Sequence, residues 1–268
     1  MLARYKKILL IGLFACVVLA QAARAEDVDY INPDRPGLTD GSNVVGAGYF
    51  QIETGMQQEF RRNNTLEDRR IFLPTLLRLG INAQWEARIE NNVHTWQRQT
   101  HSSSGVSKSQ GYVPVSLGVK YHMQDANSSA QPSLGAILRV FPESGSGSYR
   151  SSQTTGDFRL VADWDFAPDW SLNPNLGLAI YEDGKQQLFT TGLFAMTLTY
   201  SQSEVLRFFG STGVHSPEEK NGKTAIIYEA GMTYSISRNV QLEFSTGVGA
   251  AGSTAPDSFI AAGISVRL

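Results

Sequence analysis

The chain has 268 residues, with 23 Lys and Arg against 25 Asp and Glu, and a single cysteine, Cys16. This slightly acidic balance does not suit binding to the phosphates of nucleic acids, so nucleic acid is excluded as a partner. A lone cysteine likewise excludes a disulfide framework.

Residues 1–25 have the three parts of a secretory signal peptide. Three basic residues lie among the first seven, the apolar run ILLIGLFACVVLA follows, and the small-x-small triplet Ala23-Arg24-Ala25 closes the segment. The apolar run is shorter than the roughly 20 residues that a membrane-spanning helix needs. A lipid-attachment site at Cys16 fits less well, because the apolar run continues beyond the cysteine. We therefore predict export and cleavage after Ala25.

The mature chain that this cleavage leaves has no cysteine. Four of the 23 Lys and Arg are removed with the signal peptide and no acidic residue is, so 19 basic residues face 25 acidic ones, a net charge of −6. The mature chain shows no domain boundary, no helical periodicity of useful length and no second long apolar run. We predict one all-β domain over residues 46–268, preceded by a polar N-terminal segment over residues 26–45.

The N-terminal segment is too polar to enter lipid, and it contains Asp34, Arg35 and Pro36 just before a glycine that favours a turn. One interpretation is a disordered periplasmic leader. The other is a plug, in which these three residues fold into the mouth of a barrel. We favour the plug, because inward-facing cations such as Arg78 or Arg88 need partners that a free terminus can supply.

From residue 49 onward, about twelve stretches of roughly ten residues alternate apolar and polar side chains, which is the period of a β-strand. In the first stretch Phe50, Ile52 and Met56 share one face of the strand. Glu53 and Glu59 share the other face. Such strands predict a transmembrane barrel, whose apolar side chains meet lipid and whose polar side chains meet a wet lumen.

The polar faces of these strands carry charges of both signs. If the tight turn after the second strand centres on Asn82, Arg78 lies opposite Glu86, which is a favourable cross-strand pair. The predicted lumen-lining residues of a pore are Glu53, Arg78, Glu86, Arg88, Glu90, Lys120, Arg139, Arg159, Asp163, Glu229 and Glu243.

The connections between the stretches alternate in length, as a meander requires. Longer loops are predicted at residues 61–70, 95–111, 142–156, 182–186, 216–222 and 250–257. Tight turns are predicted near residues 81–84, 167–169, 201–204 and 237–239, with a longer exception at 124–132. Aromatic residues beside the tight turns resemble an interfacial girdle: Trp85, Tyr121, Trp164, Phe166, Trp170, Tyr200 and Tyr234. We expect the longer loops outside the cell and the tight turns in the periplasm.

A secreted sandwich or a small soluble barrel would also alternate apolar and polar residues, with the apolar face inward. A dozen such strands would overfill a soluble core, and the polar faces lack the lysine-rich pattern of solvent-exposed strands. We therefore predict an antiparallel up-and-down transmembrane β-barrel of about 12 strands in the outer membrane of a Gram-negative cell. Its partners would be outer-membrane lipid, the outer-membrane assembly machinery and a small solute.

The sequence lacks motifs for catalysis, so we predict no enzymatic activity, no metal and no cofactor. Neither GxSxG nor HExxH occurs. Asp163 and Asp165 share a face as acid and base partners would, but structural pairing with Arg159 is the favoured interpretation. Histidines without metal-ligand spacing are His94, His101, His122 and His215.

Three short motifs carry a family resemblance: Asp34-Arg35-Pro36, then Gln51, Glu53 and Gly55, then Leu77-Arg78 with Gly80. With these motifs and a similar order of strands and loops, the chain resembles an outer-membrane family described as transporter-like proteins of the MetA pathway of phenol degradation. The resemblance implies a β-barrel with a channel or transport role. One departure is Leu268, which stands where outer-membrane barrels usually end in an aromatic residue.

Two classes of function fit these observations. The first is a channel or transporter for passive uptake of small solutes, with aromatic or hydrophobic compounds suggested by the resemblance alone. The alternative is a non-conducting structural or enzymatic barrel with a closed, charge-paired lumen. Roughly eight strands leave an interior just filled by side chains and sixteen leave an open pore, so about twelve strands predict a narrow or plugged lumen.

Overall fold

The structure, a computed structural model, describes residues 29–127, 130–215, 224–251 and 255–268. The predicted signal peptide and the predicted loop at 216–222 lie outside these residues. The described residues form strands, irregular segments and one short 3-10 turn, η1 (Gly147–Tyr149). No helix among them is long and apolar enough to cross a membrane.

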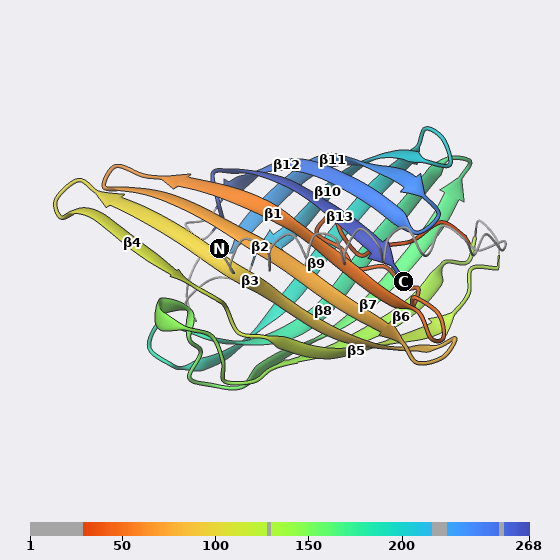
Figure 1. Ribbon diagram of the computed structural model, residues 1–268, viewed down its shortest axis with the longest axis horizontal. Helices are drawn as coiled ribbons and strands as arrows, with labels where there is room; N and C mark the ends of the chain where they lie inside the picture. The colour runs from red at the N-terminus through yellow and green to blue at the C-terminus, as the bar shows by residue number, and fades with distance from the viewer. Residues whose placement is uncertain (1–28, 128–129, 216–223, 252–254) are drawn as a thin grey trace, which may run out of the picture.

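One antiparallel sheet closes on itself to form a barrel (Figure 1). The described residues form thirteen strand segments: β1 (Phe50–Arg62), β2 (Leu66–Gly80), β3 (Trp85–His101), β4 (Gly105–Gly111), β5 (Ser116–Gln124), β6 (Ser133–Phe141), β7 (Thr155–Ala167), β8 (Trp170–Glu182), β9 (Leu188–Ser201), β10 (Leu206–His215), β11 (Ala225–Ser237), β12 (Val240–Ala251) and β13 (Ser258–Arg267). β13 pairs with β1, and β2 pairs with β3, so the ring is complete.

Two of the thirteen segments share one place in the wall. β4 pairs with one half of β3, and β5 pairs with the other half. Residues 112–115 interrupt what is otherwise a single strand. The barrel therefore has twelve strand positions, all antiparallel and joined in chain order, which confirms the predicted fold.

The two faces of the wall differ as the alternation predicts. The outer face carries exposed apolar side chains, among them Met56, Leu117 and Leu178. On the inner face the neighbouring polar side chains are buried, and Gln51 and Glu53 are 1% and 0% exposed. A charge buried behind an apolar exterior matches a lipid-facing wall around a polar lumen.

Aromatic side chains gather at the rim with the tight turns. The rings of Trp85 and Tyr121 lie 4.6 Å apart, and those of Trp170 and Tyr200 lie 4.9 Å apart. The barrel also closes at this rim, where Phe50 and Leu268 exchange two backbone hydrogen bonds. The predicted girdle is therefore present, and the terminal Leu268 holds its place in the sheet without an aromatic side chain.

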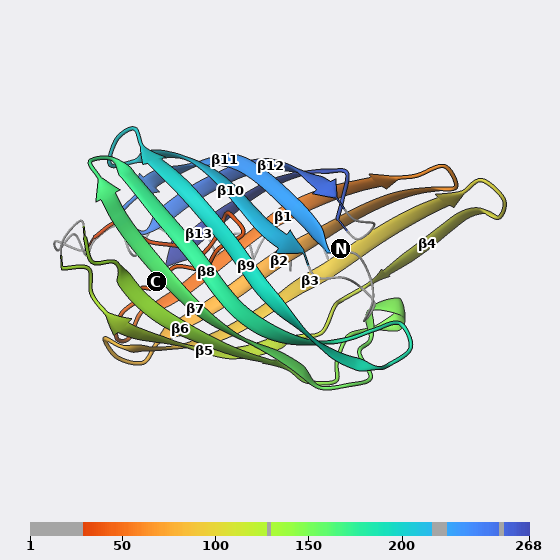
Figure 2. The same cartoon turned by 180° about the vertical axis from the view of Figure 1, so that it is seen from behind.

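Two of the predicted loops are wrong. Most of residues 61–70 and 95–111 belong to strands, and the β1–β2 and β3–β4 hairpins extend past the rest of the barrel (Figures 1 and 2). Their turns occupy only residues 63–65 and 102–104. In these parts of the strands most side chains are polar on both faces, with exceptions such as Trp96, so the apolar alternation is largely lost. The backbone ladder continues nevertheless, because it depends on main-chain groups.

The predicted register of the β2–β3 hairpin is off by two residues. Arg78 lies opposite Arg88, and Glu86 lies opposite Gly80, because the turn covers residues 81–84 rather than centring on Asn82. Arg78 still reaches Glu86 diagonally, with Nε 2.8 Å from Oε1. The opposed arginines need additional carboxylates, which the barrel interior supplies.

The assignment of the two faces predicts unequal costs for a new charge. Leu117→Arg should reduce the free energy of folding into bilayers by about 2–4 kcal/mol, because Leu117 faces lipid. Gln57→Arg is the matched control, since Gln57 lines an inner cavity beside Glu59. Urea titrations of folding into lipid vesicles measure both. Equal costs would contradict the assigned faces.

Candidate functional site

The chain before β1 lies inside the barrel, where we name residues 29–45 the inner segment. Its hydrogen bonds reach inward-facing side chains on strands around the wall, including β1, β3, β7, β8, β9 and β12. Only a segment that lies within the lumen can contact all of these strands. Asp34, Asp40 and Ser42 are buried, at 8%, 7% and 0% exposed.

Asp34 is the centre of the inner segment's charge network. Lys120 Nζ lies 2.7 Å from Asp34 Oδ2, and Arg88 donates to the same oxygen at 2.8 Å. Arg78 adds a third cation, 3.6 Å away. One aspartate thus joins cations from β2, β3 and β5, which would otherwise repel each other inside the lumen.

Arg78 uses all five of its N–H groups. Two donate to Glu86, at 2.8 and 2.9 Å, and one donates to Glu53 at 2.9 Å. The other two reach the inner segment, at the carbonyl oxygens of Asn32 (3.1 Å) and Asn43 (3.0 Å). Arg78, with all five donors satisfied, therefore attaches the inner segment to β2 at two places, Asn32 and Asn43.

Asp40 and Arg35 extend the network to opposite sides of the barrel. Asp40 accepts from Arg88 at 2.8 Å and from Arg159 at 3.1 Å, while Asn175 bonds to its backbone. Arg35 donates to Glu243 Oε1 at 2.7 Å. The segment therefore carries both signs of charge, and Asp34, Arg35 and Asp40 each meet opposite charges on the wall.

These contacts shift the pKa of both aspartates in the inner segment. Burial raises the pKa of Asp34, but Arg78, Lys120 and Arg88 outweigh it, so this pKa lies below its ordinary value. Burial also raises the pKa of Asp40. The positive charges of Arg88 and Arg159 lower it by more, so the pKa of Asp40 lies far below its ordinary range. Both carboxyls are therefore ionised at any physiological pH.

Hydrogen bonds from uncharged groups of the inner segment fix the rest of it. The hydroxyl oxygens of Thr39 and Thr197 lie 2.7 Å apart, and Ser42 N donates to Asp163 at 2.7 Å. Near its end the segment turns at Gly46, with φ +88°, and passes directly over Gly80. A Cβ on Gly80 would lie 1.6 Å from the Gly46 oxygen, so only glycine fits there. This explains the glycine of the Leu77-Arg78-x-Gly80 motif.

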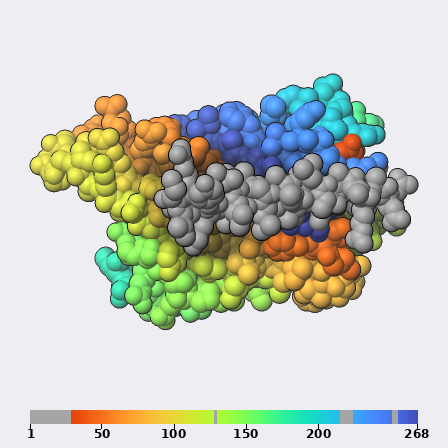
Figure 3. All heavy atoms as spheres, in the orientation of Figure 1, coloured from red at the N-terminus to blue at the C-terminus, as the bar shows by residue number. Residues whose placement is uncertain are grey.

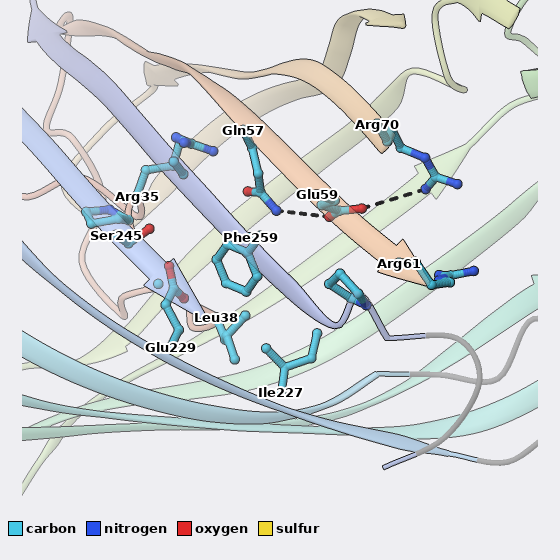
Figure 4. A pocket seen from close by; sticks show the side chains of 14 residues that line it. Arg35, Leu38, Gln57, Glu59, Arg61, Arg70, Ile227, Glu229, Ser245 and Phe259 are labelled. Carbon is cyan, nitrogen blue, oxygen red and sulfur yellow. Dashed lines mark hydrogen bonds and ion pairs between the residues drawn. The ribbon is translucent and has the colours of Figure 1, made fainter. Parts of the chain in front are cut away.

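The inner segment separates two cavities. One, of about 150 Å³, lies between the segment and β1, β11, β12 and β13; Figure 4 shows Arg35, Leu38, Glu59, Arg70 and Glu229 around it. The other, of about 360 Å³, is lined by the segment and by wall residues that include Arg139 and Tyr181. Both cavities have Arg35, Gly37 and Leu38 in their lining, so this part of the segment lies between them.

The structure places every predicted lumen residue on the inner face of the wall. Most are buried, and Glu90, Arg159 and Asp163 are half-buried. Asp163 does not pair with Arg159 as expected, because it accepts instead from Ser42 and Asn173. Arg35 and Pro36 are joined by a cis peptide bond.

Sequence reasoning missed several residues of this site. Asp40 was only one acidic residue among several in the segment, and its two arginine partners come from distant strands. Asp157, which pairs with Arg139 at 2.8 Å, was identifiable from its place on the polar face of β7. The neutral partners Asn175, Thr197 and Ser133 gave no signal, because uncharged polar residues are ordinary on a lumen face.

Two of the histidines have local partners that explain their positions. His94 stacks on Trp96 at 4.3 Å, and His122 lies 2.9 Å from Asp125. Across the described residues, no three of the His, Cys, Asp and Glu side chains are grouped to hold a metal ion. The chemistry of this interior is charge pairing and hydrogen bonding.

Asp34→Asn tests the charge network. It leaves Lys120 and Arg88 buried without their shared anion, which costs about 3–5 kcal/mol for a broken buried pair, so the inner segment should detach. Hydrogen exchange of the backbone amides of Ser42 and Val45, which donate to Asp163 and Glu86, should then accelerate. Asp29→Asn is the matched control, because Asp29 is exposed. Unchanged protection in Asp34→Asn would exclude the network as the anchor.

The lowered pKa values predict how pH acts on the inner segment. An aspartate whose folded pKa is depressed contributes stability above its free pKa and loses it as pH falls through the folded value. Protection factors of the Asp40 and Gly41 amides, which donate to Asn175 and Asp34, should therefore stay constant from pH 8 down to about pH 4, where free aspartate begins to protonate. They should fall only in stronger acid. A drop near pH 6 would contradict the pairing.

Comparison with known proteins shows which fold the chain shares. None of the curated proteins matches it. Among solved structures, an outer membrane channel from Pseudomonas putida F1 is similar, with a TM-score of 0.64 and 11% identity over 87% of this chain and 99% of that chain. The beta domain of the Bordetella autotransporter BrkA has a TM-score of 0.54 and 14% identity, over 82% of this chain and 98% of that chain. At these identities the similarity shows a shared outer-membrane barrel fold.

The family comparison covers nearly all of the predicted mature chain. A family model described as "Putative MetA-pathway of phenol degradation" matches residues 33–268, which include the Asp34-Arg35-Pro36 motif and the whole barrel. The chain belongs to this family of outer-membrane β-barrels.

Proposed function

We propose that this protein is an outer-membrane channel for passive uptake of small solutes, and that its inner segment closes the lumen at rest. The observation that carries the proposal is the position of the inner segment between two cavities, held there by ion pairs to Arg78, Arg88 and Lys120. Both cavities lie toward the long-loop ends of the strands, and displacing the segment would connect them to the tight-turn end of the lumen. The inner segment is then a plug as well as a structural element.

The lumen wall supports a solute path with no strong preference for charge. In the larger cavity Arg139 bonds to Glu90 at 2.6 Å and to Asp157 at 2.8 Å, so its charge is already compensated. Phe141 and Tyr181 add aromatic surface to the same lining. Such a wall suits small neutral solutes with some aromatic character, and the family description, which refers to phenol degradation, points to the same class.

A non-conducting barrel is the alternative function. The same ion pairs would then serve only to fill the lumen, and the inner segment would never leave it. An enzymatic role has less support, because no catalytic arrangement is found among the described residues and the related folds include channels and autotransporter domains. We place the protein in the outer membrane after signal-peptide cleavage, with lipid and the assembly machinery as partners.

Single-channel recording in planar bilayers tests the proposed function. Asp34→Asn with Asp40→Asn, and a chain beginning at Gly46, should both show more frequent or larger openings than the intact mature protein, because the segment's ion pairs are lost. Asp29→Asn, with the same kind of change at an exposed site, should behave as the intact protein. Absence of current from all forms, with insertion proven, would favour the closed barrel.

A further inference from the structure

The β1–β2 and β3–β4 hairpins carry a row of cations on their outer surface. Arg69 on β2 lies opposite Arg98 on β3, which in turn lies opposite Lys108 on β4. All three side chains are exposed. They point away from the interior, because the residues beside them in each strand, Asp68 and Gln97, face inward and bond to each other. We name Arg69, Arg98 and Lys108 the cation row.

The cation row lies just beyond the apolar surface of the barrel. The adjacent cross-strand row contains Ile71 and Trp96, and Trp96 is 43% exposed on the outer face. Phe60, opposite Arg69, packs its ring 5.7 Å from that guanidinium. Exposed aromatic side chains next to arginine and lysine are typical of the boundary between lipid and headgroups. The hairpins project beyond the rest of the barrel (Figure 3).

Three like charges directly opposite one another are unfavourable. Side chains opposed across neighbouring strands lie about 5 Å apart at Cβ, where equal charges destabilise the sheet. Among the described residues, no carboxylate forms an ion pair with any member of the cation row. By contrast, Arg70, which faces inward from β2, lies 4.0 Å from Glu59. The wall thus pairs Arg70 with an anion inside. Outside, Arg69 donates to the neutral Gln58 at 2.7 Å, and Glu67, on the same face of β2, forms no ion pair with the row among the described residues.

We infer that the cation row binds the phosphate groups of a phosphorylated glycolipid in the outer leaflet of the membrane. Phosphate oxygens match the fork of arginine N–H groups, and one phosphate can bridge two neighbouring guanidinium groups. The row lies beside Trp96, and Phe60 lies opposite Arg69 within it, which is the level expected of the headgroup layer. This inference concerns the lipid surface and does not depend on whether the lumen conducts.

Binding of lipid A to the folded protein in a nonionic detergent tests the inference. Phosphorylated lipid A should bind the wild-type protein roughly tenfold or more tightly than it binds Arg69→Gln with Arg98→Gln, because charge-assisted hydrogen bonds are lost. Arg150→Gln with Lys185→Gln is the matched control, since it removes two exposed cations at the same end of the barrel. This control should bind like the wild type. Dephosphorylated lipid A should bind all forms weakly.

Thermal unfolding gives a second readout. If the cation row only stabilised the sheet, Arg98→Gln would not change the unfolding temperature in opposite directions with and without lipid. Without lipid, Arg98→Gln should raise the unfolding temperature, because it removes like-charge repulsion at the centre of the row. With phosphorylated lipid A, the wild type should become the more stable of the two. Equal binding of phosphorylated and dephosphorylated lipid A, or the same loss in the control variant, would overturn the inference. So would an Arg98→Gln protein that is less stable under both conditions.

Discussion

A buried charge must have a partner, and this constraint organises the whole interior of the barrel. Arg78, Arg88 and Lys120 lie on adjacent strands and are almost fully buried, so the wall alone would concentrate positive charge. Removing such ions from water costs several kcal/mol each unless opposite charges and hydrogen bonds compensate. Asp34 and Asp40 of the inner segment supply that compensation. The N-terminal segment is therefore part of the folded core.

The same constraint connects stability to function. A segment held by neutral contacts alone could detach at little cost, whereas one held by paired buried charges leaves unpaired cations behind when it moves. In the proposed channel, opening would then be rare, and anything that offers the cations another anion would make it more frequent. The barrel wall itself remains closed by backbone hydrogen bonds, from β13 to β1 and from β2 to β3. The inner segment could therefore move while the wall stays closed.

The sequence predicts the strands of the barrel wall better than it predicts the contacts inside the lumen. Alternation at Phe50, Glu53 and Met56 identifies faces, because each strand meets lipid on one side and water on the other. It weakens at residues 95–111, where most side chains on both faces are polar and Trp96 and Val106 are the large apolar exceptions. The pairing of Arg35 with Glu243 connects residues 208 positions apart, and no local pattern carries such information. Burial of Asp34 follows from charge balance, but its choice of Lys120 and Arg88 required the three-dimensional register.

The central claim is that the inner segment must leave its place for solute to pass. The hydroxyl oxygens of Thr39 and Thr197 lie 2.7 Å apart, so Thr39→Cys with Thr197→Cys allows a disulfide between segment and wall. Single-channel current of this variant, combined with Asp34→Asn, is the most direct measurement. The account predicts a silent channel when oxidised and openings after reduction, with either single cysteine insensitive to both treatments. Equal current before and after reduction of a fully cross-linked protein would contradict it.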